Sequence, residues 1–141
     1  MNDKNIKLGD WTSLQKDAQA IRYAVFVVEQ KIPADLEWDA MDALCLHAVA
    51  YDENNKPIGT GRLLPDGHIG RMAVMESARG IGIGAAILLR LMEQAKLRGQ
   101  HGVQLNAQIT AESFYQREGF AREGELFEEA GIPHVHMTHH F

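Results

Sequence analysis

The segment from Ala78 to Ala85 constrains the fold of this chain of 141 residues more than any other. Three glycines at alternate positions separate a predicted strand, His68–Val74, from a strongly apolar predicted helix, Gly82–Arg98. Residues without side chains let a ligand approach the backbone closely. The first N–H groups of a helix lack partners within it and lie at the positive end of its dipole. With Arg79 at its rim, this glycine turn predicts a site for phosphate oxygens.

Two nucleotide motifs fit the turn poorly. Gly80, Gly82 and Ala85 match the dinucleotide fingerprint G-x-G-x-x-A, but residues 75–78 intervene where that fingerprint follows its strand at once. The next predicted strand, Val103–Ala107, does not end in the acid that such sites use to bind ribose. No Gly-Lys-Ser/Thr follows, which excludes a P-loop. A tight packing turn without a ligand remains the alternative.

Two motifs resemble the GCN5-related N-acetyltransferase (GNAT) family. Arg79, Gly82 and Gly84 stand at the defined positions of its Q/R-x-x-G-x-G/A signature. The segment Phe114–Phe120, which begins 30 residues after Gly84, is similar to its F-Y-x-x-x-G-F motif. The two ends of the chain resemble small bacterial acetyltransferases of the ElaA and YjcF type. The pattern of Arg22, Phe26, Asp39 and Asp42 also resembles acyl-homoserine-lactone synthases, which are generally longer.

The pattern of elements agrees with that fold. Helical spacing of apolar residues predicts a first helix over Thr12–Glu29, capped by Thr12 and Gln15. An antiparallel meander, a parallel strand–helix–strand unit over His68–Ala107 and a final helix with two strands are expected to follow. The resulting expectation is one α/β domain, residues 1–141, with a mixed, mostly antiparallel central sheet flanked by helices. The remaining predicted elements are Leu46–Tyr51, Ile58–Leu64, Ala111–Glu118, Phe120–Gly124 and His134–His140.

The resemblance implies acetyl-CoA-dependent transfer of an acetyl group to a primary amine of a small molecule, by direct attack in a ternary complex. It implies that the strands splay apart and that the pantetheine arm of the cofactor pairs with strand backbone. The acceptor stays open among an amino sugar phosphate such as glucosamine 6-phosphate, a polyamine, an amino acid and a peptide N-terminus. A non-catalytic acyl-CoA-binding or regulatory module on the same fold is the alternative from another class. The implied cofactor-binding residues are Met72, Ala73, Val74, Arg79, Gly80, Ile81, Gly82, Ile83, Gly84, Ala85 and Gln108.

The resemblance also assigns catalytic roles. Tyr115 matches the family's catalytic tyrosine, and a phenol that is protonated at neutral pH can donate to the leaving thiolate. Gln108 stands where the family often has an asparagine that contacts the cofactor, and its amide can make similar hydrogen bonds. Acids between Glu29 and Asp42 can take the proton of the amine or bind a cationic substrate, and Glu29 is the first candidate. Solvated surface charge is the alternative for each acid.

Substrate contacts are expected near the first helix and the C-terminal strand. Arg22 either binds a substrate carboxylate or phosphate or pairs with a nearby acid. The expected substrate-binding residues are Arg22, Phe26, Gln30, Glu37, Asp39 and His134. Four histidines near the end of the chain allow a zinc-site hypothesis, but a pocket or subunit contact is favoured and no metal is predicted.

Composition limits the partners and the cellular location that the chain can be expected to have. A formal charge of −5 argues mildly against nucleic acid as the main partner. No apolar run approaches the roughly 20 residues that span a bilayer, so no membrane role is expected. Cys45 is the single cysteine, which excludes an internal disulfide and favours the cytoplasm. A homodimer is permitted by the apolar content and is not required by it.

Overall fold

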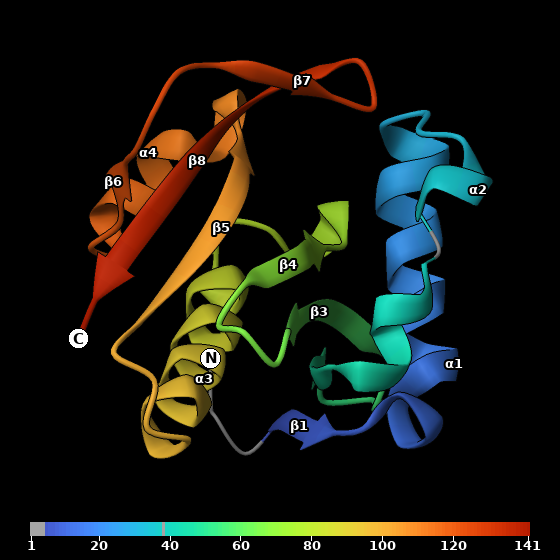
Figure 1. The fold of residues 1–141 in the computed structure, drawn as a ribbon. Coiled ribbons are helices and arrows are strands. Elements are labelled where there is room, and N and C mark those ends of the chain that lie inside the picture. The colour runs from blue at the N-terminus through green and yellow to red at the C-terminus, as the bar shows by residue number, and fades with distance from the viewer. Residues whose placement is uncertain (1–4, 38) are drawn as a thin grey trace.

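The computed structural model describes residues 5–37 and 39–141, without the side chains of residues 36 and 37. Its elements form two sheets with helices packed against them (Figure 1). The strands are β1 (Ile6–Gly9), β2 (Leu46–Tyr51), β3 (Pro57–Leu63), β4 (Ile69–Val74), β5 (Gly102–Gln108), β6 (Ala121–Arg122), β7 (Phe127–Glu129) and β8 (Ile132–His140). The helices are α1 (Trp11–Arg22), η2 (Tyr23–Glu29), α2 (Ala34–Glu37), η3 (Ala40–Leu44), η4 (Glu76–Ala78), α3 (Ile83–Leu97), η5 (Ile109–Ala111) and α4 (Glu112–Arg117).

The first sheet has the order β1-β2-β3-β4, and all its pairs are antiparallel. The predicted meander is therefore confirmed. Helix α1 packs on one face through Leu14, Ala18 and Ile21, and α3 packs on the other. A Cβ at Gly59 of β3 would lie 2.9 Å from side-chain atoms of both Ile83 and Ile87. Glycine in this strand therefore lets α3 approach the sheet closely.

The second sheet has the order β5-β8-β6, with β7 also paired to β8. Between the two sheets, the expected parallel pairing is confirmed only at its start, because an isolated parallel bridge joins His68 to Gln104. Beyond that bridge β4 and β5 belong to different sheets and diverge (Figure 1). The splay that the family resemblance implies is present. Each strand keeps an antiparallel partner on its other side, β3 or β8.

The first helix differs from its prediction at both ends. Its N-cap is Asp10, whose Oδ1 accepts a hydrogen bond of 2.9 Å from the N–H of Ser13, so the predicted Thr12–Gln15 capping box is wrong. The α-helix ends at Arg22 and continues as the π-helix η2. The run Val25–Val28 contains three β-branched valines, which pack less easily into a regular α-helix. The wider π turn is a form that is often found at functional sites.

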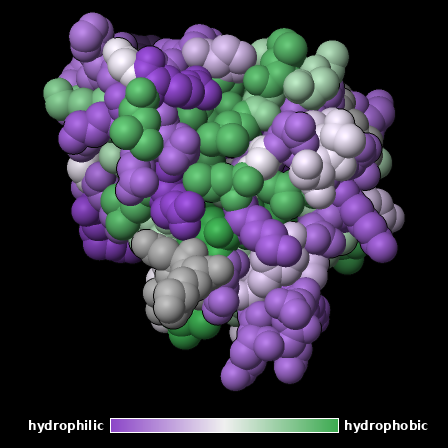
Figure 2. All heavy atoms as spheres, turned by 90° about the horizontal axis from the view of Figure 1, so that it is seen from below, coloured by the Kyte–Doolittle hydropathy of each residue, from purple (hydrophilic) through white to green (hydrophobic). Residues whose placement is uncertain are grey.

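The C-terminal elements differ mainly in length. The predicted strand over Phe120–Gly124 is reduced to β6, and the sequence pattern does not predict β7. Residues Phe127–Glu129 of β7 are all exposed, so they lack the alternation that marks a half-buried strand. Seen from below, the surface gathers hydrophobic residues in the middle of the face among hydrophilic ones (Figure 2). Such mixing is ordinary for a folded surface, and the homodimer stays a prediction.

Candidate active site

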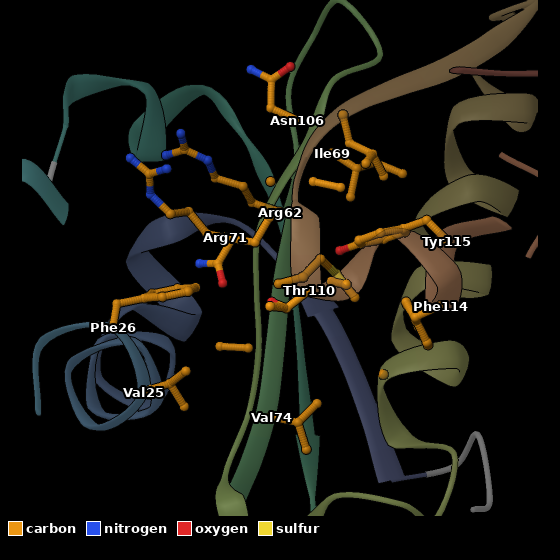
Figure 3. Close-up of a pocket in the computed structure, with 18 of the residues that line it drawn as sticks. Val25, Phe26, Arg62, Ile69, Arg71, Val74, Asn106, Thr110, Phe114 and Tyr115 are labelled. Atoms are coloured by element: carbon orange, nitrogen blue, oxygen red, sulfur yellow. The ribbon is translucent and has the colours of Figure 1, made fainter. Parts of the chain in front are cut away.

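A cavity of about 1260 Å³ opens where β4 and β5 diverge. This exceeds the roughly 300–1,000 Å³ of most small-ligand pockets. Figure 3 shows Val25 and Phe26 of η2 on one side of the strands and Phe114 and Tyr115 of α4 on the other. The π-helix and the predicted F-Y motif therefore form opposite walls of one space.

The glycine turn lies at one end of this cavity. Gly80 and Gly82 have φ values of +83° and +87°, and a Cβ on either would meet no atom within 4 Å. Both positions therefore need glycine for their backbone conformation and leave open space beside it. Gly82 is the N-cap of α3, and no side chain of the described residues caps that helix. The first N–H groups of α3 are thus available to an anionic ligand.

Arg79 is held at the rim of the turn by three hydrogen bonds. Its Nη1 and Nη2 donate to the two carboxylate oxygens of Glu29 at 2.8 and 2.6 Å, and its Nε donates to the carbonyl of Val74 at 3.0 Å. The hydrogen bond from Arg79 lowers the pKa of Glu29. Glu29 does not line the cavity; it is attached to a residue that does. In this arrangement its carboxylate is ion-paired and is a weak base.

Tyr115 reaches into the cavity from α4. Its ring is 8% exposed and packs edge-on against Phe114 and Phe120, at centroid distances of 5.0 and 5.9 Å. Figure 3 shows the hydroxyl oxygen directed toward the strands between the two walls. Burial raises the pKa of Tyr115 to about 12. The phenol therefore keeps its proton throughout the neutral range and can act as an acid.

Three more predicted residues meet at the cavity. Nε2 of Gln108 donates to Oε1 of Gln30 at 2.8 Å, which joins the end of β5 to the residue after η2. His134 of β8 is buried, and its Nδ1 lies 2.7 Å from the carbonyl of Ile132. The ring of Phe127 stacks on His134 at 5.9 Å. Gln30, Gln108 and His134 all line the cavity, so segments that are far apart in sequence converge there.

The acetyltransferase (GNAT) domain family matches residues 15–141. YjcF of Bacillus subtilis, an uncharacterised N-acetyltransferase, is 40% identical over 86% of this chain and 89% of its own. The crystal structure of Escherichia coli ElaA has a TM-score of 0.85 at 28% identity, covering 95% of this chain and 98% of its own. The crystal structure of a protein from Lactobacillus plantarum, assigned as an N-acetyltransferase, has a TM-score of 0.88 at 33% identity, covering 96% of this chain and 96% of its own.

The chain belongs to the GNAT acetyltransferase family. Its resemblance to ElaA and YjcF is confirmed by these relatives, and so is the predicted GNAT fold. Among the described residues, no helix is long and apolar enough to cross a bilayer.

Most residues predicted for this GNAT site do line the cavity. They are Phe26, Gln30, Asp39, Met72, Ala73, Val74, Arg79, Gly80, Gly82, Ile83, Gly84, Ala85, Gln108, Tyr115 and His134. Ile81 is 63% exposed and lies outside the lining. Glu37 is the last residue of α2, and its side chain lies outside the described part of the chain.

The prediction that Arg22 binds the substrate is wrong. Its side chain is 1% exposed and does not line the cavity, so it is not placed to touch a substrate. Nη1 and Nη2 of Arg22 donate to the two carboxylate oxygens of Asp42 at 2.8 and 3.1 Å. Of the two roles left open by the sequence, the structure shows the second, pairing with a nearby acid. This ion pair fastens the end of α1 to η3.

Asp39 lines the cavity as predicted, but it is already paired with cations. Arg62 donates to both of its oxygens at 2.8 and 3.0 Å, and Arg71 donates to Oδ2 at 3.2 Å. The hydrogen bonds from Arg62 lower the pKa of Asp39 to about 2. At neutral pH this carboxylate is ionised and neutralised by its neighbours, so it is a weak base and a poor site for a substrate cation.

The sequence prediction missed several lining residues, most notably Arg62, Arg71 and Asn106. Each stands within a predicted strand and outside any motif. The alternation of side chains along a strand could have predicted which face of the sheet each residue occupies. It could not have predicted a neighbouring cavity, because that cavity forms only where two strands diverge.

Cys45 and the C-terminal histidines have ordinary surroundings. Cys45 is buried, and its thiol donates to the carbonyl of Met41 at 3.0 Å, as expected for a small buried residue. Among the described residues, no group of three or more His, Cys, Asp or Glu side chains is placed to share a metal ion.

The Arg22–Asp42 pair predicts a large effect on stability. We expect Asp42→Asn to lower the free energy of unfolding by roughly 3–5 kcal/mol, because it removes the buried negative charge to which both Arg22 and Arg62 donate. Glu112→Gln is the control, since it removes the charge that pairs with Arg122, whose side chain is 43% exposed, and should cost far less than Asp42→Asn. Urea unfolding measures both. Equal losses in the two variants would contradict a structural role for the buried pair.

Proposed function

We propose that this chain is an acetyl-CoA-dependent N-acetyltransferase that acetylates a primary amine of a small molecule. The amine nitrogen attacks the thioester carbonyl within a ternary complex, the carbon–sulfur bond breaks, and the CoA thiolate takes up a proton. The observation that carries this proposal is the cavity between the diverging strands. It has a glycine turn at one end, which no described side chain caps, and a buried tyrosine on its wall.

The glycine turn would hold the pyrophosphate of acetyl-CoA. Support comes from the first N–H groups of α3, the open space beside Gly80 and Gly82, and the positive charge of Arg79. A Bacillus anthracis protein assigned as a streptothricin acetyltransferase was crystallised with acetyl coenzyme A. It shares the fold with a TM-score of 0.60 at 20% identity, over 69% of this chain and 62% of its own.

The pantetheine arm would lie along β4. Residues Met72, Ala73 and Val74 line the cavity, and within the described chain β4 pairs with β3 while its other edge diverges from β5 after the bridge at His68. The edge that faces β5 can therefore offer N–H and C=O groups to the amides of the arm, as a sheet edge does to an added strand. Gln108 at the end of β5 is close enough to the same opening to contribute its amide.

Two side chains would handle protons. Tyr115 protonates the leaving thiolate, since its hydroxyl faces the cavity and retains its proton. Glu29 becomes a candidate base only when the pyrophosphate takes its place on Arg79, because the freed carboxylate then regains a more ordinary pKa. Binding of the cofactor would thus prepare the base.

Calorimetric titration with acetyl-CoA tests the cofactor site. We expect the wild type to bind about one molecule per chain, with Arg79→Ala raising Kd roughly tenfold through loss of a charged hydrogen bond to phosphate. Arg98→Ala removes an equal charge at the other end of α3 and should leave Kd unchanged. Failure of the wild type to bind at millimolar acetyl-CoA would overturn the proposed function.

Glu29→Gln tests the two roles of the carboxylate. Removal of the exposed ion pair with Arg79 should lower the Kd for acetyl-CoA roughly two- to fivefold, because the phosphate no longer competes with Glu29. Loss of a base should lower kcat by about 100-fold. Titration and thiol release measure the two effects separately, and an unchanged kcat would remove Glu29 as the base.

Tyr115→Phe separates an enzyme from a non-catalytic binder. We expect kcat to fall by about 100-fold with acetyl-CoA affinity retained, whereas a pure binder has no turnover to lose. Tyr51→Phe is the control, since the Tyr51 hydroxyl donates to Asp17 at 2.5 Å outside the cavity.

The pH profile adds a second readout for Tyr115. A pKa raised to about 12 keeps the phenol protonated to higher pH than an ordinary tyrosine. The wild type should therefore show no alkaline loss of kcat due to Tyr115 up to about pH 10. An alkaline loss between pH 8 and 10 that disappears in Tyr115→Phe would contradict this assignment.

A further inference from the structure

His134 lies on β8 at a point where three strands bring side chains to one face of the second sheet. It is paired with Gln108 of β5 on one side and with Phe127 of β7 on the other, in antiparallel register. Side chains that are directly opposite each other in an antiparallel pair share one face. Gln108 and His134 both line the cavity, so this face of the sheet is turned toward it.

Hydrogen bonding gives the two ring nitrogens of His134 different roles. Nδ1 lies 2.7 Å from the carbonyl oxygen of Ile132, and a carbonyl can only accept, so Nδ1 carries a proton. In the neutral ring Nε2 then keeps a free electron pair. The side chain is 8% exposed, and the ring of Phe127 stacks on it at an interplanar angle of 27°. The imidazole is therefore held in one orientation with Nε2 as its proton acceptor.

Glu129 places a carboxylate beside that nitrogen. Its Oε2 lies 3.4 Å from Nε2 of His134, which is longer than the roughly 2.7–3.2 Å of an N–H···O hydrogen bond. The loop between β7 and β8 fixes this placement, because Ala130 and Gly131 have φ values of +54° and +75°, as in a two-residue hairpin turn. Glu129 lines the cavity, and its side chain is 52% exposed. A proton on Nε2 would thus have a carboxylate beside it that reaches solvent.

Gln108 connects His134 to the segment that carries Glu29. Nε2 of Gln108 donates to Oε1 of Gln30 at 2.8 Å, and Gln30 directly follows Glu29. The Cβ atoms of a directly opposed pair lie only about 4.5–5.5 Å apart, so His134 is next to this contact. Figure 1 shows the turn between β7 and β8 extending toward the end of η2. His134 and the segment of Glu29 therefore meet at one contact on the cavity wall.

The proposed reaction needs two proton acceptors, and Glu29 accounts for only one of them. A primary amine enters at neutral pH as an ammonium ion, which must lose a proton before its nitrogen has an electron pair for attack. After attack the nitrogen is positively charged again, and it must lose a second proton to give the amide. Tyr115 returns one proton to the thiolate, so the complete reaction releases one proton to solvent.

We propose that Nε2 of His134 takes the first of these protons, from the ammonium group of the acceptor. One N–H bond of the ammonium ion breaks as the Nε2–H bond forms, and the electron pair stays on the amine nitrogen. Glu129 is a positioning residue that balances the charge of the resulting imidazolium. The inference rests on the proposed acetyltransferase function and adds a catalytic residue to it.

Nitrogen NMR of the protein with labelled histidine tests the arrangement without any acceptor. The signal of His134 is assigned by its loss in His134→Gln. We expect its neutral ring to carry the proton on Nδ1 and none on Nε2. A neutral ring with its proton on Nε2, or a ring that stays doubly protonated up to pH 9, would overturn the proposal.

Thiol release with acetyl-CoA tests the chemical role. The probes are glucosamine 6-phosphate, spermidine, lysine and glycylglycine, and the amine with the fastest turnover is used. We expect His134→Gln to lower kcat/KM about 100-fold at pH 7. This loss should shrink as the pH rises toward the pKa of the amine, because the free amine then needs no base. A loss that stays constant between pH 7 and 9 would indicate a structural role and overturn the proposal.

The controls separate this step from the function on which it rests. His139→Gln removes another β8 imidazole whose Nδ1 lies 2.8 Å from a carbonyl, that of Gly119, and it should leave kcat/KM unchanged, because His139 does not line the cavity. Glu129→Gln should lower kcat up to about fivefold, and Glu129→Asp should restore most of it. Turnover of none of the four amines would instead overturn the proposed transfer to an amine, and the NMR tautomer would still decide whether His134 can serve as a base.

Discussion

The divergence of β4 and β5 is the constraint on which the rest of the structure depends. The strands touch at the bridge between His68 and Gln104 and then belong to separate sheets. Buried backbone N–H and C=O groups need partners, so an open edge inside a protein implies water or a ligand beside it. The opening does not unfold either half, because β3 pairs with β4 and β8 pairs with β5. The cavity therefore follows from the order in which the strands pair.

Local signals in the sequence predicted the parts that depend on local chemistry. The glycine turn, the helix after it and the three-stranded meander follow from backbone conformation and short-range periodicity, and the structure contains them all. The π-helix η2 could not be read in the same way, because apolar spacing over Thr12–Glu29 fits either helix type. Its widened turn brings Gln30 to Gln108, a contact between residues that are 78 positions apart.

The roles of the charged side chains were the least predictable feature, because they depend on partners that are distant in sequence. The acids of the segment from Glu29 to Asp42 invite assignment to a cationic substrate. In the folded chain Glu29 pairs with Arg79, Asp39 with Arg62, and Asp42 with Arg22. The partners are 50, 23 and 20 positions away, so counts of charge along the chain could not reveal them. The fold thus turns an apparently acidic segment into one whose acids Glu29, Asp39 and Asp42 are each paired with an arginine.

These ion pairs also differ in burial. An exposed pair can exchange its partner at little cost, whereas a buried pair cannot. The side chains of Arg79 and Glu29 are 40% and 36% exposed, and an exposed pair contributes only about 0–1 kcal/mol. A pyrophosphate can therefore displace Glu29 at little cost. Arg22 and Asp42 are 1% and 4% exposed, and breaking a buried pair costs roughly 3–5 kcal/mol. The end of the cavity at the proposed pyrophosphate site can thus rearrange, while the buried pair of Arg22 and Asp42 stays fixed.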